Sequence, residues 1–240
     1  MSLRAEDAPA TLKDRLALAL DVDDLVAAQR LARELSPWFG VVKVGLELFS
    51  AAGPAVVTEM IASGYRVFVD LKLADIPTTV ERAARVLGAL GASYLTMHSF
   101  GGTVMLRAGV DGFSEGAAAA GLDAPCALAV TVLTSEDAPP GLVLERVEVA
   151  LEAGCGGVVC AASDVAEVKE LAPRLLAVVP GTRLAGTPVH DHRRSATPAE
   201  ALASGADLLV VGRAVTRAPD RAQAATDLMA SLEASLAPPA

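Results

Sequence analysis

The chain has 240 residues, of which 52% are hydrophobic and 20% are charged, which is enough for one large core. Its 29 acidic residues outnumber its 20 Lys and Arg residues, so the formal net charge is −9. This balance argues against nucleic acid as a partner, because proteins that bind it need a basic stripe to neutralise phosphates.

The sequence shows no feature of an exported or membrane protein. Its N-terminal segment is polar, and its longest apolar runs are too short to span a bilayer. Cys126, Cys155 and Cys160 form no CxxC pair, and their odd number favours reduced core thiols over a disulfide framework. We therefore expect a cytoplasmic protein with no membrane partner.

Short β-branched or leucine-rich runs recur along the chain, separated by segments with helical spacing. The expected strands are 15–22, 40–47, 66–73, 93–100, 126–134, 156–162, 175–181 and 207–213. The expected helices include 25–35, 55–64, 79–91, 142–154 and 199–206, and several of them end at glycine. The element boundaries within the Gly/Ala-rich segment 101–121 are not evident from the sequence.

Eight alternations of strand and helix in this length predict an α/β fold, a (β/α)8 TIM barrel. The alternative, a doubly wound open sheet, would normally have fewer strands, and no GxGxxG opens the first expected helix. No segment looks like a domain linker. We expect a flexible N-terminal tail over residues 1–14 and a single barrel domain over residues 15–240.

Charged residues gather at the ends of the first three expected strands, where barrel enzymes carry their chemistry. Asp21 ends the first strand, Lys43 lies in the second, and Asp70 and Lys72 lie in the third. Taken singly, Asp21 could flank a helix cap and Lys43 could snorkel to solvent. Phe68, Asp70 and Lys72 are expected on one face, because strand side chains alternate. Since buried charges persist only when paired or used, this group indicates a functional site.

The residue types at this site favour an organic anion over a metal ion. The histidines are His98, His190 and His192, and none has the spacing of a helical zinc pair. Asp21 and Asp70 could hold magnesium, but the neighbouring lysines would repel a divalent cation. We therefore expect neither a metal nor an organic cofactor.

The last two expected strands end in glycines that could expose backbone N–H groups to a phosphate. These are Gly181 and Gly212, and Arg213 could add a bidentate clamp. The polar segment between them, 182–198, is too long for a plain connection and is typical of a lid that closes over a ligand. A solvated loop is the alternative.

The chain resembles the orotidine 5′-phosphate decarboxylase family over residues 15–232. The resemblance is specific because several motifs occur in the family's order. These are "ALDV" with Asp21, "VKVG" with Lys43, "DLKLADIPTT" with Asp70, Lys72 and Asp75, "TVLTS" with Thr134, "PGTR" with Arg183, and "VGRAVT" with Gly212 and Arg213.

The resemblance implies a homodimeric enzyme that converts orotidine 5′-monophosphate to UMP, the last step of de novo UMP biosynthesis, without metal or cofactor. Lys72 would donate a proton to C6 of the pyrimidine, and Asp70 would lie against the substrate carboxylate. Lys43 and Asp75 would complete an alternating row of charges. Asp75 and Thr79 would reach the site from the partner subunit, so that the two active sites are shared.

The resemblance also assigns the binding residues. Asp21, Lys43 and Thr79 would hold the ribose, Thr134 would lie at the pyrimidine, and Arg183, Gly212 and Arg213 would meet the phosphate. In the lid, His192 stands where the family commonly has a glutamine. Histidine can still donate one hydrogen bond, but its charge depends on pH near neutrality.

Two other functions stay open at this point. A phosphosugar barrel enzyme, of the hexulose-phosphate synthase or pentulose-phosphate epimerase type, would require a divalent metal and lack the "DIPTT" continuation. A catalytically silent phosphonucleotide-binding barrel would bind UMP and release no CO2.

Overall fold

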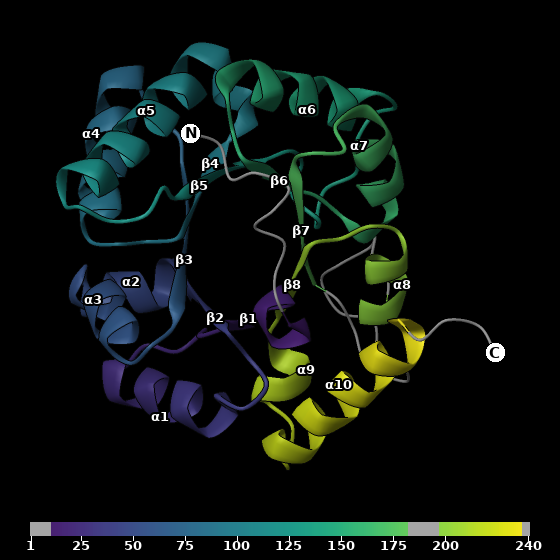
Figure 1. Cartoon of the computed structure of the whole chain (residues 1–240). Helices are drawn as coiled ribbons and strands as arrows, with labels where there is room; N and C mark the ends of the chain where they lie inside the picture. Colours follow the sequence, from purple (N-terminus) through teal and green to yellow (C-terminus); the bar gives the residue numbers. More distant parts are fainter. Residues whose placement is uncertain (1–10, 182–196, 237–240) are drawn as a thin grey trace.

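The computed structural model describes residues 11–181 and 197–236. Eight parallel strands form a closed ring, with the helices around its outside (Figure 1). Each strand pairs with the next, and β8 pairs with β1 to close the barrel. The strands are β1 (Leu16–Ala19), β2 (Val41–Gly45), β3 (Arg66–Leu73), β4 (Tyr94–His98), β5 (Cys126–Val130), β6 (Gly157–Val159), β7 (Leu176–Pro180) and β8 (Leu208–Val211). The predicted (β/α)8 barrel is confirmed, and each strand lies within its expected range.

The helices fill the connections between strands. The predicted helix 25–35 has the observed bounds, because the Asp24 carboxylate caps its first turn by accepting the Ala27 N–H. The α-helices are α1 (Leu25–Leu35), α2 (Leu46–Ala52), α3 (Ala55–Ala62), α4 (Pro77–Ala89), α5 (Gly102–Ala119), α6 (Leu142–Ala153), α7 (Val165–Leu171), α8 (Pro198–Ala203), α9 (Arg213–Thr216) and α10 (Arg221–Leu236). Short 3-10 helices are η2 (Leu12–Arg15), η3 (Ser99–Gly101) and η4 (Ala162–Asp164).

The strands separate two apolar clusters, because successive side chains point to opposite faces of a strand. Leu95 and Met97 of β4 belong to the larger cluster, which also contains buried residues of the helices. Tyr94 of β4 and Phe68 of β3 belong to the smaller cluster inside the barrel. Their rings meet edge to face with centroids 6.0 Å apart. Inside the barrel, this aromatic pair lies on the amino-terminal side of the charged residues that follow on β3.

Helices α4 and α5 pack backbone to backbone. A Cβ on Gly88 of α4 would lie 2.1 Å from the Phe113 carbonyl oxygen, and one on Gly116 of α5 would lie 2.0 Å from that of Arg85. No side chain fits into either space, so the two helices require glycine at these crossing points. The Gly/Ala-rich composition of 101–121, which gave no boundary in the sequence, is that of a helix face packed against another backbone.

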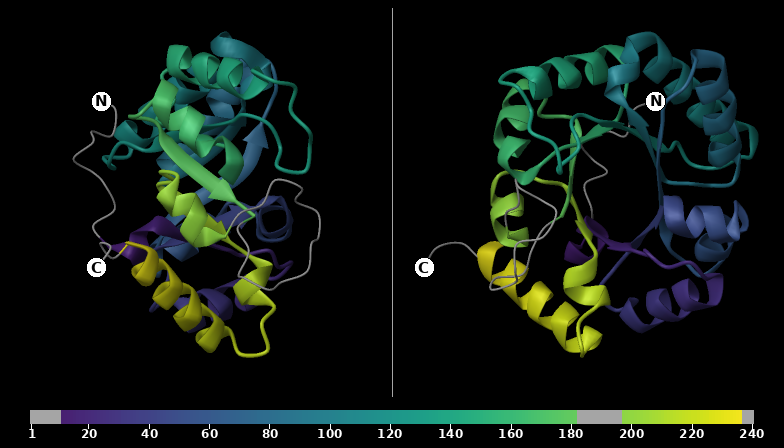
Figure 2. Two further views of the ribbon diagram at one scale, coloured as in Figure 1. Left: turned by 90° about the vertical axis from the view of Figure 1, so that its right-hand side faces the viewer. Right: turned by 180° about the vertical axis from the view of Figure 1, so that it is seen from behind.

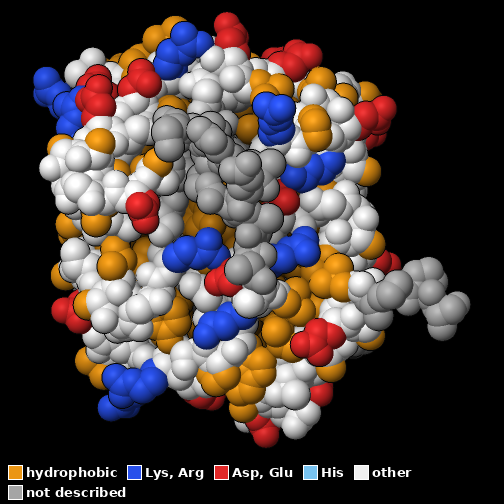
Figure 3. Space-filling view, in the orientation of Figure 1, with side chains coloured by type: hydrophobic (Ala, Val, Ile, Leu, Met, Phe, Trp, Pro, Cys, Tyr) orange, Lys and Arg blue, Asp and Glu red, His pale blue; other side chains and the backbone are white. Residues whose placement is uncertain are grey.

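The amino-terminal ends of the strands are bridged by polar contacts. Figures 1 and 3 view this end, where Lys and Arg side chains gather around the centre. Arg66 donates to the backbone oxygen of Asp14 at 2.8 Å, and Arg15 donates to that of Ala206 at 2.6 Å. Residues 12–14, the end of the predicted tail, therefore belong to η2 and contact the barrel, while residues 1–10 lie outside the described residues.

The strands run away from this end, and their carboxyl ends open on the opposite face. The left panel of Figure 2 shows the strands from the side, and its right panel views the carboxyl ends. The charged residues predicted from the sequence lie at that face. Within the described ranges, no helix combines the length and the apolar character that a membrane span needs.

Candidate functional site

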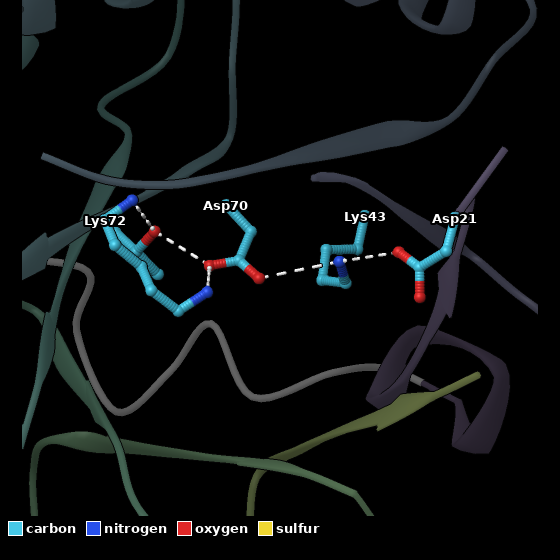
Figure 4. A network of polar contacts seen from close by, with 5 residues as sticks. Asp21, Lys43, Asp70 and Lys72 are labelled. Carbon is cyan, nitrogen blue, oxygen red and sulfur yellow. Dashed lines mark hydrogen bonds and ion pairs between the residues drawn. The ribbon is translucent and has the colours of Figure 1, made fainter. Parts of the chain in front are cut away.

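Four charged side chains lie in a line across three neighbouring strands (Figure 4). The ammonium of Lys43 lies 3.2 Å from an Asp21 carboxylate oxygen and 3.5 Å from Oδ2 of Asp70. The ammonium of Lys72 donates to Oδ1 of Asp70 at 2.7 Å. Acid and base alternate along this charged row, from Asp21 through Lys43 and Asp70 to Lys72. Its formal charges cancel, which is the condition for keeping them near a core.

Strand register brings the row together. Lys43 on β2 lies opposite Ala19 on β1, and Asp70 on β3 lies opposite Gly45 on β2. A Cβ on Gly45 would lie 3.0 Å from the Lys43 ammonium nitrogen. The glycine therefore leaves room for the Lys43 side chain between its two carboxylates. In the sequence, the signal for this role is the glycine two positions after the lysine in "VKVG".

The backbone departs from the expected strand geometry at Lys72. Its φ is +52°, in the left-handed region that non-glycine residues seldom adopt. The regular alternation of side-chain direction expected for Phe68, Asp70 and Lys72 therefore ends before Lys72. The Lys72 side chain nevertheless contacts Asp70. The Lys72 N–H is accepted by the hydroxyl of Thr96 at 2.9 Å, and this hydroxyl donates to Asp70 at 3.0 Å. Sequence reasoning missed Thr96.

Asp70 is held as a carboxylate by its neighbours. Burial alone would raise the pKa of Asp70, but the charges of Lys43 and Lys72 and hydrogen bonds from Lys72 and Thr96 bring it below its usual value. The side chain of Asp70 is only 15% exposed, whereas that of Lys72 is 30% exposed. The row thus presents a fixed negative charge and a more accessible ammonium group side by side.

His98 ends β4 near this row and is half-buried. Burial lowers the pKa of His98 and the charge of Lys72 lowers it further, although Glu136 and Asp70 oppose the shift. Its ring lies 4.6 Å from that of Phe100. The imidazole is therefore neutral near pH 7 and adds no further positive charge beside Lys72.

Asp75 and Thr79 do not join the charged row within this chain. Asp75 is exposed between β3 and α4, and its carboxylate accepts the N–H of Ile76 at 2.7 Å. Thr79 is exposed in the first turn of α4, where its N–H donates to the Ile76 carbonyl. Asp21 instead occupies one end of the row, at the side of Lys43 away from Asp70.

The residues predicted to meet the pyrimidine and phosphate lie in the loops after β5, β7 and β8. Thr134 is half-buried in the turn after β5, and Gly212 precedes the short helix α9, which begins with the exposed Arg213. A Cβ on Gly212 would lie 4.0 Å from an Asp21 carboxylate oxygen, so the end of β8 comes close to the charged row. The predicted Arg183 and His192 lie outside the described residues.

Other reactive groups lie apart from this site. Burial raises the pKa of the Cys126 and Cys155 thiols, that of Cys155 to about 12, so neither is an activated nucleophile. Cys160 is also buried. Within residues 11–181 and 197–236, no three His, Cys, Asp or Glu side chains form a group that could hold a metal ion.

Comparison with known proteins identifies relatives over almost the whole chain. The family described as "Orotidine 5'-phosphate decarboxylase / HUMPS family" matches residues 14–228. The chain is 45% identical over 234 residues to the orotidine 5′-phosphate decarboxylase of Moorella thermoacetica, covering 92% of this chain and 93% of the relative. It is 46% identical over 231 residues to that of Anaeromyxobacter dehalogenans, covering 91% and 98%. The crystal structure of the orotidine 5′-phosphate decarboxylase from Lactobacillus acidophilus matches with a TM-score of 0.75 at 34% identity, covering 91% of this chain and 99% of that one.

Proposed function

Because the chain belongs to the orotidine 5′-phosphate decarboxylase / HUMPS family, we propose that it decarboxylates orotidine 5′-monophosphate to UMP. This reaction is the last step of de novo UMP biosynthesis. The observation that carries the proposal is the charged row at the carboxyl ends of β1–β3, with an ammonium and a carboxylate 2.7 Å apart. The relatives that match at 45% and 46% identity are both named as decarboxylases, which favours this activity over the phosphosugar chemistry.

The proposed chemistry places Lys72 at the reacting carbon. The bond between C6 and the carboxylate breaks, CO2 leaves, and the electron pair stays on C6. The Lys72 ammonium stabilises this charge and then donates a proton to C6. The neutral Lys72 amine then takes up a proton from solvent water. At ~4 Å and an effective dielectric constant of ~20, one such charge pair is worth roughly 4 kcal/mol.

The rest of the row binds and orients the nucleotide in this proposal. Asp70 faces the departing carboxylate, and Asp21 and Lys43 hold the ribose hydroxyls. The partner's Thr79 joins these ribose contacts, and Thr134 lies at the pyrimidine. Gly212, Arg213 and Arg183 hold the phosphate, with His192 as a further contact. Binding energy from the ribose and phosphate contacts orders the reacting groups and contributes to the rate. No metal or organic cofactor takes part.

We also propose that the functional unit is a homodimer in the cytoplasm, in which Asp75 and Thr79 complete the partner's site. Large apolar side chains near these residues are exposed in the single chain: Ile76 is 67% exposed, Phe100 61% and Val104 73%. A second copy that covers this surface would bury them and bring Asp75 towards a partner's Lys72.

The activity is tested by following the absorbance change of orotidine 5′-monophosphate on its conversion to UMP, with and without EDTA. We expect turnover that EDTA leaves unchanged. Lys72→Ala is expected to nearly abolish turnover while leaving the circular dichroism spectrum and UMP binding in place. Loss of this activity with EDTA would refute the metal-free mechanism, and UMP binding without turnover would favour the silent barrel.

Shared active sites are tested by mixing two inactive variants, Lys72→Ala and Asp75→Asn, under conditions that exchange subunits. Each mixed dimer would contain one site with both residues intact, so an equal mixture is expected to regain about a quarter of the wild-type activity. No recovery from subunits shown to have exchanged would refute the crossing of Asp75.

A further inference from the structure

Thr96 is the polar side chain most deeply enclosed beside the charged row. It lies in the middle of β4 and is 0% exposed. Its hydroxyl accepts the N–H of Lys72 at 2.9 Å and donates its own hydrogen to Oδ1 of Asp70 at 3.0 Å. The same Asp70 oxygen accepts from the Lys72 ammonium at 2.7 Å. One hydroxyl thus connects the backbone of one charged residue with the carboxylate of the other.

The sheet needs a hydrogen-bond acceptor at this position. Val69 pairs with Leu95 and Leu73 pairs with Met97, so residues 70–72 of β3 stand opposite the single residue Thr96 of β4. The regular ladder is interrupted there, and the Thr96 hydroxyl accepts the Lys72 N–H instead. The left-handed conformation of Lys72 is strained for a residue with a side chain, and it persists only where its surroundings hold it.

The other buried hydroxyl side chains among the described residues, those of Ser99 and Thr131, bond to backbone oxygens. Ser99 donates to the carbonyl of Val130 at 2.7 Å, and Thr131 donates to that of Val159 at 2.9 Å. Both tie one strand end to a neighbouring backbone. Only Thr96, of these three, contacts an ionised side chain of the charged row.

We propose that Thr96 is a positioning residue, whose hydroxyl fixes the Asp70 carboxylate and the Lys72 backbone in one geometry so that the ammonium points at the reacting carbon. This inference rests on the proposed decarboxylation. Thr96 does not touch the substrate in this role, and acts through the two residues that do. A threonine suits the position because its β-branched side chain restricts the rotamers of the hydroxyl.

The test compares wild type with Thr96→Val, which keeps the shape and removes the hydroxyl, and Thr96→Ser, which keeps the hydroxyl. Thr131→Val is the matched control, because it removes a buried hydroxyl that bonds only to backbone. We expect Thr96→Val to lower kcat by about 10²-fold with KM within about threefold of wild type, since misplacement of reacting groups acts on turnover. Thr96→Ser should recover most of kcat, and Thr131→Val should retain wild-type kcat.

The outcomes separate this inference from the proposed function. A wild-type protein without decarboxylase activity refutes both. An active wild type whose Thr96→Val variant keeps its kcat, or loses no more than Thr131→Val, refutes the role of Thr96 alone. If Thr96→Val does not fold, Thr96→Ala replaces it, and equal kcat values for the Ala and Ser variants would refute the role of the hydroxyl.

Discussion

The variant Asp70→Asn tests whether the charged row stabilises the fold as well as the reaction. Asn keeps the shape of Asp70 and removes the negative charge between two ammonium groups, at 3.5 Å from Lys43 and 2.7 Å from Lys72. At an effective dielectric constant of ~20, these pairs are worth roughly 5 and 6 kcal/mol before the desolvation of the charges is subtracted. Because the remaining ammonium groups stay partly buried, we expect a net loss of about 3–5 kcal/mol in unfolding free energy.

The sign of the pH dependence follows from the lowered pKa of Asp70. Its ionisation contributes stability that is fully present above the unfolded pKa of about 4 and is lost as pH falls through the folded pKa. Asp70→Asn lacks this contribution at every pH. The difference in unfolding free energy between wild type and variant should therefore be largest near neutral pH and shrink in acid.

Urea denaturation, followed by the fluorescence of the single tryptophan Trp38, measures these free energies. Glu81→Gln is the control, because Glu81 pairs with Arg85 on the surface of α4, and its loss should change stability little. An Asp70→Asn variant as stable as wild type at neutral pH would refute the reasoning. So would a stability difference that does not shrink as pH falls.

Three further variants probe single contacts. Gly45→Ala should lower kcat/KM by about tenfold or more, because the added Cβ displaces the Lys43 ammonium. The melting temperature should change little, because the Gly45 φ of −90° suits alanine. Unchanged kinetics would contradict this. Arg213→Ala should raise KM by about tenfold or more while kcat is largely kept, because a phosphate contact is lost. Steady-state kinetics that show a lower kcat at constant KM would argue against a simple binding role. Gly88→Ala should lower the free energy of unfolding by about 3 kcal/mol, because its Cβ would meet the Phe113 carbonyl. A variant that unfolds in urea at the wild-type midpoint would show that α4 and α5 can move apart with no loss of stability.

Much of the architecture could be predicted from the sequence, because it depends on neighbouring residues. The composition of runs such as 126–134 predicts a buried strand, and Asp24 before the apolar stripe of 25–35 indicates the start of a helix. The eightfold alternation of such signals then leaves few topologies other than a barrel. The charged residues of β1–β3 were also found, because Asp70 and Lys72 interrupt an otherwise apolar strand.

Other features depended on contacts between distant segments. The Gly/Ala-rich segment 101–121 gave no boundary, because Gly112 and Gly116 allow a close contact with the backbone of α4 that no local pattern records. Thr96 looked like an ordinary strand residue, although it shares the inward face of β4 with Tyr94 and His98.

The sequence by itself determined which residues form strands and which carry charge, since period-two alternation and side-chain chemistry are local properties. Tertiary structure alone decided the left-handed turn at Lys72 and the hydroxyl bridge from Thr96 to Asp70. Both follow from the offset between β3 and β4, where three residues face one. Such an offset is a property of two paired strands, and neither strand encodes it alone.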